Sequence, residues 1–262
     1  MTATADPAAL VRTVTLDVDP SWSVGGKPHG GYLLRGAVEA ALDPAHPHPM
    51  AVSAHYVSSP SESAATVTVE RVRTGRRVAT SRVRLAQGNE ARVEVLVSAG
   101  TWTPSSQAYW SAPGGPPALP ALADCPRVPA VGPTGRVVGY FDHVDLRIDP
   151  TTALWAQGRP QGQAEIRGWM RRDDAADASP LDLLVFCDAM PPVTLDLGLM
   201  GWVPTLELTV HVRALPAPGW LRVVQRARLL QDGWLDEECE VWDSSDRLVA
   251  QSRQLAGYRL ED

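Results

Sequence analysis

The sequence predicts an α+β protein built from two tandem copies of one unit, each a helix that lies on an antiparallel sheet. Three observations lead to this prediction. Apolar residues make up 44% and charged residues 21% of the 262 residues, which is typical of a folded globular chain. A stretch rich in proline and glycine divides the chain into two parts. Both parts contain a strand, a helix and several further strands in the same order, which defines the α+β class.

The dividing stretch runs from Pro104 to Gly135 and contains eight prolines and four glycines. This composition disfavours helices and central strands alike and is typical of a linker. We therefore expect a first domain over residues 1–103, a linker over residues 104–135 and a second domain over residues 136–262.

Matching residues recur in the two parts. The segments VSAHYVSSP (52–60) and LTVHVRALP (208–216) each contain a histidine and a proline, and both residue types recur at an interval of 156 residues. Further on, Ala99-Gly100 corresponds to Ala256-Gly257. Self-similarity at a fixed interval indicates that one supersecondary unit occurs twice.

In the first copy, hydrophobic periodicity separates one helix from several strands. Leu34, Ala37, Val38 and Ala41 recur at helical spacing and predict a helix over residues 31–42. Alternating patterns predict strands over residues 12–18, 51–57, 65–73, 77–87 and 92–101.

In the second copy, the helix has a clear start signal. Ser179 can cap the helix, Pro180 suits the first helical position, and Asp182 completes the spacing of a capping box. We expect this helix to run at least to Met190, because Pro191-Pro192 opposes its continuation. Strands are predicted over residues 137–147, 205–213, 220–230, 234–242 and 248–259.

Charge and composition exclude several classes of function. The formal net charge is −6, and an acidic chain is a poor general binder of nucleic acids and of anionic membranes. The sequence has no run of about 18 apolar residues, so we expect no transmembrane helix. The first residues lack the basic and apolar segments of a signal peptide, and the expected location is the cytoplasm.

The cysteine pattern and the absence of two motifs argue against several kinds of structure and reaction. Cys125, Cys187 and Cys239 are odd in number and widely spaced, which argues against a disulfide framework and against a zinc site. The absence of G-x-S-x-G disfavours a serine α/β-hydrolase, and the absence of G-x-x-x-x-G-K-[ST] disfavours an NTPase. We expect chemistry that uses neither a metal ion nor a cofactor.

Four short stretches, taken in order, resemble a known family. They are VGGKPHGGY (24–32), FCD (186–188), PTLEL (204–208) and LVAQSRQ (248–254). With their helices and the linker, they resemble the type II (TesB-like) acyl-CoA thioesterases, which are double-hotdog proteins. The resemblance implies two tandem hotdog domains, an acyl-CoA substrate and a homodimer or higher homo-oligomer, because hotdog sheets commonly pair.

The resemblance also implies roles for particular residues. In this family an Asp on the second helix, a Thr on the next strand and a Gln on the last strand hold the hydrolytic water. By position these are Asp188, Thr205 and Gln254. The family's Gln is followed by an acid and a glycine, whereas Leu255 follows here, so Gln251 is the alternative for the catalytic glutamine.

The residues themselves make Asp188 a plausible general base. It shares a helix face with Leu181, Leu184 and Val185, and this face is expected to pack on the sheet. Burial would raise the pKa of the Asp188 carboxyl and suit it to accept a proton. The alternative is a buried aspartate with a purely structural role.

Thr205 and Gln254 are neutral hydrogen-bonding groups that could orient a water molecule. On a regular strand, Thr205 would share a face with Glu207, Thr209 and His211. Such a polar face is usually only solvated, and the same structural interpretation applies to Gln254.

The first copy contributes further candidates for substrate binding. His29-Gly30-Gly31 opens the predicted helix and allows either close backbone approach to a ligand or a tight turn. Glu39 takes the place that corresponds to Asp188 and is either a second base or the partner of Arg35 in an i,i+4 pair.

The function predicted from the sequence is hydrolysis of a fatty acyl-CoA to free acid and CoA, and two alternatives stay open. One is a hotdog enoyl-thioester hydratase or dehydratase, for which Asp43 and His48 have a similar spacing. The other is an acyl-CoA-binding protein without catalysis, because fold alone does not determine function. His46 and His48 lie in a proline-rich stretch and are expected to be exposed.

Overall fold

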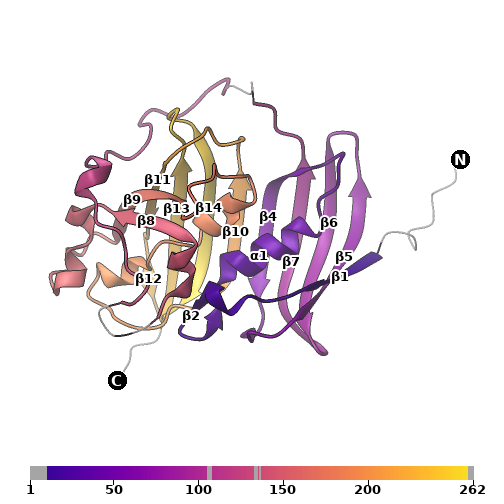
Figure 1. Cartoon of the computed structure of the whole chain (residues 1–262), viewed down its shortest axis with the longest axis horizontal. Helices are drawn as coiled ribbons and strands as arrows, with labels where there is room; N and C mark the ends of the chain where they lie inside the picture. Colours follow the sequence, from indigo (N-terminus) through magenta and orange to yellow (C-terminus); the bar gives the residue numbers. More distant parts are fainter. Residues whose placement is uncertain (1–10, 105–107, 133–134, 136, 259–262) are drawn as a thin grey trace, which may run out of the picture.

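Twelve strands form one continuous antiparallel sheet that both copies share (Figure 1). The structure is a computed structural model, and it describes residues 11–104, 108–132, 135 and 137–258. The α-helices found in these residues are α1 (Gly30–Glu39) and α2 (Asp182–Phe186), which pack against each other. The sheet strands of the first copy are β1 (Val11–Leu16), β4 (His48–Tyr56), β5 (Ala65–Thr74), β6 (Val78–Gln87) and β7 (Glu90–Gly100).

The strands of the second copy repeat this arrangement with one addition. They are β8 (Val144–Ile148), β9 (Glu165–Arg172), β10 (Thr205–Val212), β11 (Leu221–Arg226), the short β12 (Leu230–Gln231), β13 (Trp234–Trp242) and β14 (Leu248–Gly257). The order across the sheet is β1-β5-β6-β7-β4-β10-β14-β13-β11-β9-β8. β9 pairs with β11 as β1 pairs with β5, so β9 is the counterpart of β1, and it was missed in the sequence prediction. The added strand is β8, which lies at the edge beyond β9. A small separate sheet pairs β2 (Ser23–Val24) with β3 (Lys27–Pro28).

The two half-sheets join through the strands that the sequence repeat identified. β4 pairs with β10, and Ser53 lies opposite Thr209. These two residues are separated by the same 156-residue interval that relates the histidines and prolines of the repeat. Equivalent residues therefore face each other at the centre of the seam, as they do on a local two-fold axis. The 156-residue interval in the sequence and the register of β4 against β10 therefore reflect the same two-fold symmetry.

The hydrogen bonds predicted for the start of the second helix form, but α2 begins only at Asp182 and is shorter than predicted. The backbone N–H of Ser179 donates to Asp182 Oδ2 (2.8 Å), and the backbone N–H of Asp182 donates to Ser179 Oγ (3.3 Å), so the capping box forms. The α-helix then ends at Phe186, not at Met190. The backbone N–H of Asp188 already bonds the carbonyl of Val185, in the tighter pattern of a helix end.

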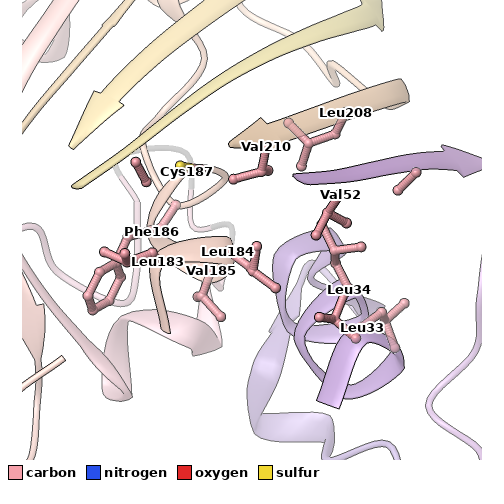
Figure 2. Close-up of a cluster of buried hydrophobic side chains, with 14 of the residues drawn as sticks. Leu33, Leu34, Val52, Leu183, Leu184, Val185, Phe186, Cys187, Leu208 and Val210 are labelled. Carbon is pink, nitrogen blue, oxygen red and sulfur yellow. The ribbon is translucent and has the colours of Figure 1, made fainter. Parts of the chain in front are cut away.

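Both helices pack with the inner face of the sheet into one hydrophobic core. Figure 2 shows Leu33 and Leu34 of α1 beside Leu184 of α2, below Val52 of β4 and Leu208 of β10. Each of these five side chains is buried. Because the same cluster includes residues of both copies, neither copy has a core of its own.

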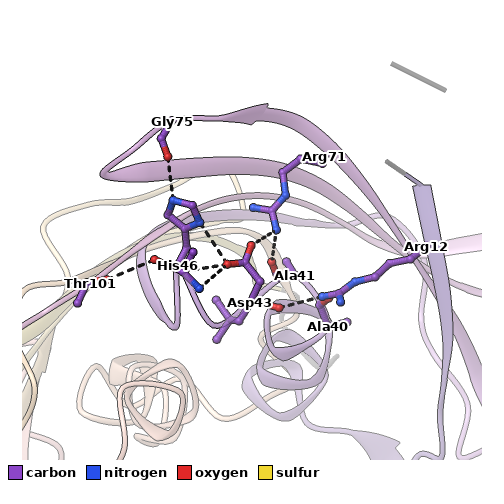
Figure 3. A network of polar contacts seen from close by, with 10 residues as sticks. Arg12, Ala40, Ala41, Asp43, His46, Arg71, Gly75 and Thr101 are labelled. Atoms are coloured by element: carbon purple, nitrogen blue, oxygen red, sulfur yellow. Dashed lines mark hydrogen bonds and ion pairs between the residues drawn. The ribbon is translucent and has the colours of Figure 1, made fainter. Parts of the chain in front are cut away.

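A polar network attaches the end of α1 to the hairpin between β5 and β6 (Figure 3). His46 lies with Nδ1 3.2 Å from Asp43 Oδ1 and with Nε2 2.9 Å from the carbonyl oxygen of Gly75. Arg71 donates to Asp43 Oδ2 at 2.7 Å. The expectation that His46 is exposed was wrong, because these bonds hold the side chain in the interior with an exposed fraction of 3%.

None of the helices in the described residues is both long enough and apolar enough to span a membrane.

The seam offers a direct test of the shared core. Leu208 is fully buried, whereas Leu206 on the same strand is 41% exposed. Leu208→Ala should lower the free energy of unfolding by about 2–5 kcal/mol, because it leaves a cavity at the junction of both copies. Leu206→Ala should change that free energy by no more than about 0.5 kcal/mol. Urea unfolding of the three proteins measures both values, and equal losses would contradict the assignment of the inner face.

Candidate active site

The site begins at the N-terminus of α1, which His29 caps. His29 Nδ1 accepts a hydrogen bond from the backbone N–H of Tyr32 (3.2 Å). Because Nδ1 is the acceptor, the proton of the neutral imidazole lies on Nε2. Nε2 can then donate to the backbone carbonyl oxygen of Asp188, 3.0 Å away. His29 therefore links the first turn of α1 to the segment that follows α2.

Asp188 lies just beyond the end of α2 and points across the junction of the copies. Its Oδ2 accepts a hydrogen bond from the backbone N–H of Gly31 (2.6 Å) and lies 3.5 Å from His29 Nε2. The side chain is 12% exposed. No hydrogen bond from the described residues reaches the other oxygen, Oδ1. One carboxylate oxygen is thus fixed, and the other is free to contact a small molecule.

Burial raises the pKa of the Asp188 carboxyl above its ordinary value, as the sequence analysis expected. His29 and the N–H of Gly31 act in the opposite direction and favour the carboxylate. The N-terminus of a helix also favours a negative charge. Such opposing effects are typical of a group that accepts a proton during catalysis.

The two glycines at the start of α1 leave room for this approach. A Cβ on Gly30 would lie 2.9 Å from Asp188 Oδ2 and 3.2 Å from the ring of Tyr56. A Cβ on Gly31 would lie 3.0 Å from the backbone of Val185 and from Asp188 Cβ. Gly30 and Gly31 are therefore required by the close contact between the helices, which explains the pattern seen in the sequence.

Tyr56 lies beside Asp188 at the start of α1, where a Cβ on Gly30 would contact both side chains. Its hydroxyl is buried and has no hydrogen-bond partner in the described part of the chain. Burial raises the pKa of the phenol well above its ordinary value, and the charge of Asp188 adds to this effect. Tyr56 is thus a neutral donor beside the carboxylate, and the sequence analysis did not identify it.

A β-bulge changes the direction of Thr205. The register of β10 against β14 shifts between Thr205 and Glu207, so Thr205 lies opposite the buried Ala256. Directly opposite residues share a face of the sheet, so Thr205 faces the interior. The expectation that it shares the outer face with Glu207 was wrong, because that expectation assumed regular alternation.

The bulge brings Thr205 to Gln254. Thr205 Oγ1 donates to Gln254 Oε1 (3.0 Å), and Gln254 Nε2 donates to Glu237 Oε2. Glu237 lies on the inner face of β13 directly opposite Gln254 and is only 2% exposed. The sequence analysis missed Glu237, although its place between Leu235 and Cys239 in an alternating strand was a detectable signal.

The remaining candidates lie elsewhere. Glu39 is exposed at the opposite end of α1 from His29. Arg35 Nε lies 3.6 Å from Asp182 Oδ1, and within the described residues no ion pair joins Arg35 to Glu39. Gln251 is exposed on the outer face of β14. The structure therefore places His29, Gly30, Gly31 and Asp188 together, and Thr205 together with Gln254.

A metal ion has no evident place here. Within the described residues, no group of three or more His, Cys, Asp or Glu side chains could hold one. The arrangement can instead bind a water molecule at Asp188 Oδ1. Hydrogen-bond donors at the start of α1 could stabilise an oxygen that becomes negatively charged.

Comparison with known proteins identifies related families. A family model described as the acyl-CoA thioesterase N-terminal domain matches residues 18–103, and the corresponding C-terminal domain model matches residues 122–258. An uncharacterized protein of Mycobacterium tuberculosis is 32% identical over 263 residues, which cover 92% of this chain and 89% of the relative.

Solved structures show the same architecture. A Thermobifida fusca protein assigned as a thioesterase II is 31% identical, with a TM-score of 0.84 over 94% of this chain and 91% of that one. A hot dog protein of Alicyclobacillus acidocaldarius is 20% identical, with a TM-score of 0.80 over 97% and 95% of the two chains. The acyl-CoA thioesterase II TesB2 of Mycobacterium marinum is 21% identical, with a TM-score of 0.64 over 89% and 90%. The fold is therefore the hotdog fold, present twice.

The burial of Asp188 predicts how stability depends on pH. Because the pKa of Asp188 is raised in the folded state, the native protein binds more protons than the unfolded chain at pH values above the ordinary aspartate pKa of 3.8. The contribution of Asp188 to stability therefore falls as the pH rises through this window. Asp188→Asn removes the effect and should gain stability relative to the wild type between about pH 4 and pH 7.

Asp43 is the matched control, because its pKa is lowered. Burial of Asp43 opposes the shift, but hydrogen bonds from the backbone of His46 and Ala45 and the charge of Arg71 outweigh it. Asp43→Asn should therefore lose stability relative to the wild type over the same pH range. Urea unfolding at a series of pH values measures both differences, and the same sign for both variants would contradict this account.

Proposed function

The chain belongs to the acyl-CoA thioesterase family, and on this premise we propose that it hydrolyses a fatty acyl-CoA to the free acid and CoA. The observation that carries the proposal is the position of Asp188, whose Oδ2 accepts a hydrogen bond from the first turn of α1 and whose Oδ1 has no hydrogen bond from the described residues. Hydrolysis of a thioester needs a base for water and donors for the carbonyl oxygen, and this junction offers both.

In the proposed reaction, Asp188 acts as the general base. Its Oδ1 removes a proton from a water molecule while the water oxygen attacks the thioester carbonyl carbon. The C–S bond then breaks, and CoA leaves as a thiolate that takes up a proton. The bond from Gly31 to Oδ2 holds the carboxylate in place during these steps. No covalent acyl-enzyme forms.

The carbonyl oxygen would be stabilised at the start of α1. The backbone N–H of Gly30 forms no hydrogen bond with the described residues, as expected for the first turn of a helix. The buried Tyr56 hydroxyl is the other unpartnered donor nearby. Donors that are already in place and shielded from water stabilise a developing negative charge most effectively.

Thr205 and Gln254 would position the water. Their hydrogen bond lies on the inner face of the second half-sheet, the face against which α2 packs. Ser252, on the same face of β14 as Gln254, donates to the carbonyl oxygen of Cys187, the residue before Asp188 (3.4 Å). This contact supports the assignment of Gln254, rather than Gln251, to the site.

The hydratase alternative depends on an Asp43–His48 pair, which the structure does not favour. Asp43 is engaged by His46 and Arg71, and His48 Nδ1 accepts a hydrogen bond from the backbone N–H of Trp102 (3.0 Å).

A homo-oligomer and a cytoplasmic location remain part of the proposal for the thioesterase.

The proposal predicts the effect of removing the base. Asp188→Asn should lower kcat by about 100-fold or more, because the amide cannot accept the proton of water. Glu39→Gln should leave kcat unchanged, because Glu39 is exposed at the far end of α1. Release of free thiol from acyl-CoAs of short to long chain length measures both rates.

Two results would contradict the proposal in different ways. Turnover that is insensitive to Asp188→Asn but lost in Glu39→Gln would move the base to the first copy. A folded wild-type protein that binds acyl-CoA but releases no thiol would indicate a binding protein instead of an enzyme.

A further inference from the structure

A second buried carboxylate lies beside the proposed hydrolytic residues, and the reaction described above does not use it. Glu237 points inward from β13, directly opposite Gln254 of β14. Gln254 lies two residues from Ser252 on the inner face of β14, and Ser252 donates to the carbonyl oxygen of Cys187, the residue before Asp188. A buried carboxylate without a basic partner is costly to maintain, so its retention in this place needs an explanation.

All hydrogen-bond donors to Glu237 are uncharged. The backbone N–H of Val193 donates to Oε1 (2.8 Å), Gln254 Nε2 donates to Oε2, and the Gln225 side chain also bonds the carboxylate. Val193 begins a short 3-10 helix, Val193–Leu195, shortly after Asp188. Glu237 thus connects the segment that holds Asp188 to the strand that holds Gln254.

The charge of Glu237 decides the direction of the hydrogen bonds that follow. An ionised carboxylate can only accept, so the amide nitrogen of Gln254 must face Glu237. The amide oxygen of Gln254 then faces Thr205 and accepts a hydrogen bond from its hydroxyl. The Thr205 oxygen is left with lone pairs and no proton to donate.

We propose that ionised Glu237 is a positioning residue of the hydrolytic site, which fixes the Gln254 amide and thereby turns the Thr205 hydroxyl so that its oxygen accepts a hydrogen bond from the water. This inference rests on the proposed function. The water then donates one hydrogen bond to Thr205 and the other to Asp188, which removes that one proton, and a lone pair of the water oxygen stays free to attack the carbonyl carbon.

Protonation of Glu237 would reverse the direction of the hydrogen bonds that run from Glu237 through Gln254 to Thr205. Its hydroxyl would donate to the Gln254 oxygen, the amide would turn over, and its nitrogen would donate to Thr205. The Thr205 hydroxyl would then donate to the water and occupy the lone pair that the attack needs. Hydrolysis therefore depends on the charge of a residue that touches neither water nor substrate.

Several groups face the two carboxylates and influence their titration. Burial, first of all, raises the pKa of Glu237, and hydrogen bonds from Val193, Gln225 and Gln254 lower it. Within the described residues, further titratable neighbours of the pair are His29, Tyr56, Tyr140, Cys187 and Cys239. Because like charges repel, the charge of Asp188 adds a smaller effect that also raises the pKa of Glu237.

The test compares Glu237→Gln with Glu238→Gln, which changes the same charge on the opposite face of the same strand. Glu237→Gln should lower kcat roughly tenfold with KM unchanged, because its amide no longer enforces one direction of hydrogen bonding. The acid limb of the kcat profile should move to lower pH and become less steep, because Asp188 then titrates alone. Glu238→Gln should change neither.

A purely structural role would give a different result. Glu237→Gln would then lower the melting temperature, and the acid limb of the remaining activity would stay in place. That result, or an unchanged kcat, would overturn the inference.

A second measurement needs no turnover and separates this inference from the proposed function. The side-chain amide signals of Gln254, identified by their loss in Gln254→Ala, should shift with pH in the wild type and become insensitive to pH in Glu237→Gln. Amide signals that titrate equally in both proteins would overturn the inference. If the wild type hydrolyses no acyl-CoA, the proposed function fails, and this titration alone decides the role of Glu237.

Discussion

The hydrogen bond from the Gly31 N–H to Asp188 Oδ2 is the contact on which the site depends. It joins the start of one helix to the end of the other and so holds the two copies in register at the point of chemistry. It also favours the charge of a carboxylate that burial would otherwise neutralise. The helices can approach this closely only because Gly30 and Gly31 lack side chains. Neither copy alone contains both partners of this bond, so the site exists only in the joined molecule.

The sheet is arranged symmetrically about the seam, but the residues of the candidate site are not. Ser53 and Thr209 face each other at the centre of the seam, and equivalent strands extend from it on both sides. The helices do not follow this symmetry in their chemistry. The second helix starts with a capping box at Ser179 instead of with glycines, and Glu39, which the sequence comparison of the copies aligned with Asp188, is exposed at the end of α1. The buried carboxylate at the junction is thus Asp188 of the second copy.

The repeat, most strands and the start of the second helix could be predicted from the sequence, because periodicity and capping are local properties. Asp188 is buried as expected, although it lies just beyond the end of α2 and not on the helix. The direction of Thr205 could not be predicted, because a bulge sets it and the bulge depends on pairing with β14. His46 and Glu237 were missed for a related reason. Their partners come from distant strands and loops, and only the tertiary structure shows that these partners satisfy a buried polar group.

The central claim is that Asp188 activates water and does not itself attack the thioester. A single turnover in ¹⁸O-labelled water, with enzyme in excess over acyl-CoA, tests this claim most directly. Mass spectrometry of the released acid and of the peptide that contains Asp188 locates the label. The account predicts one labelled oxygen in the acid from the first turnover and none in the aspartate. Label in the Asp188 carboxylate, with an unlabelled acid in that first turnover, would show an acyl-enzyme anhydride and contradict the account.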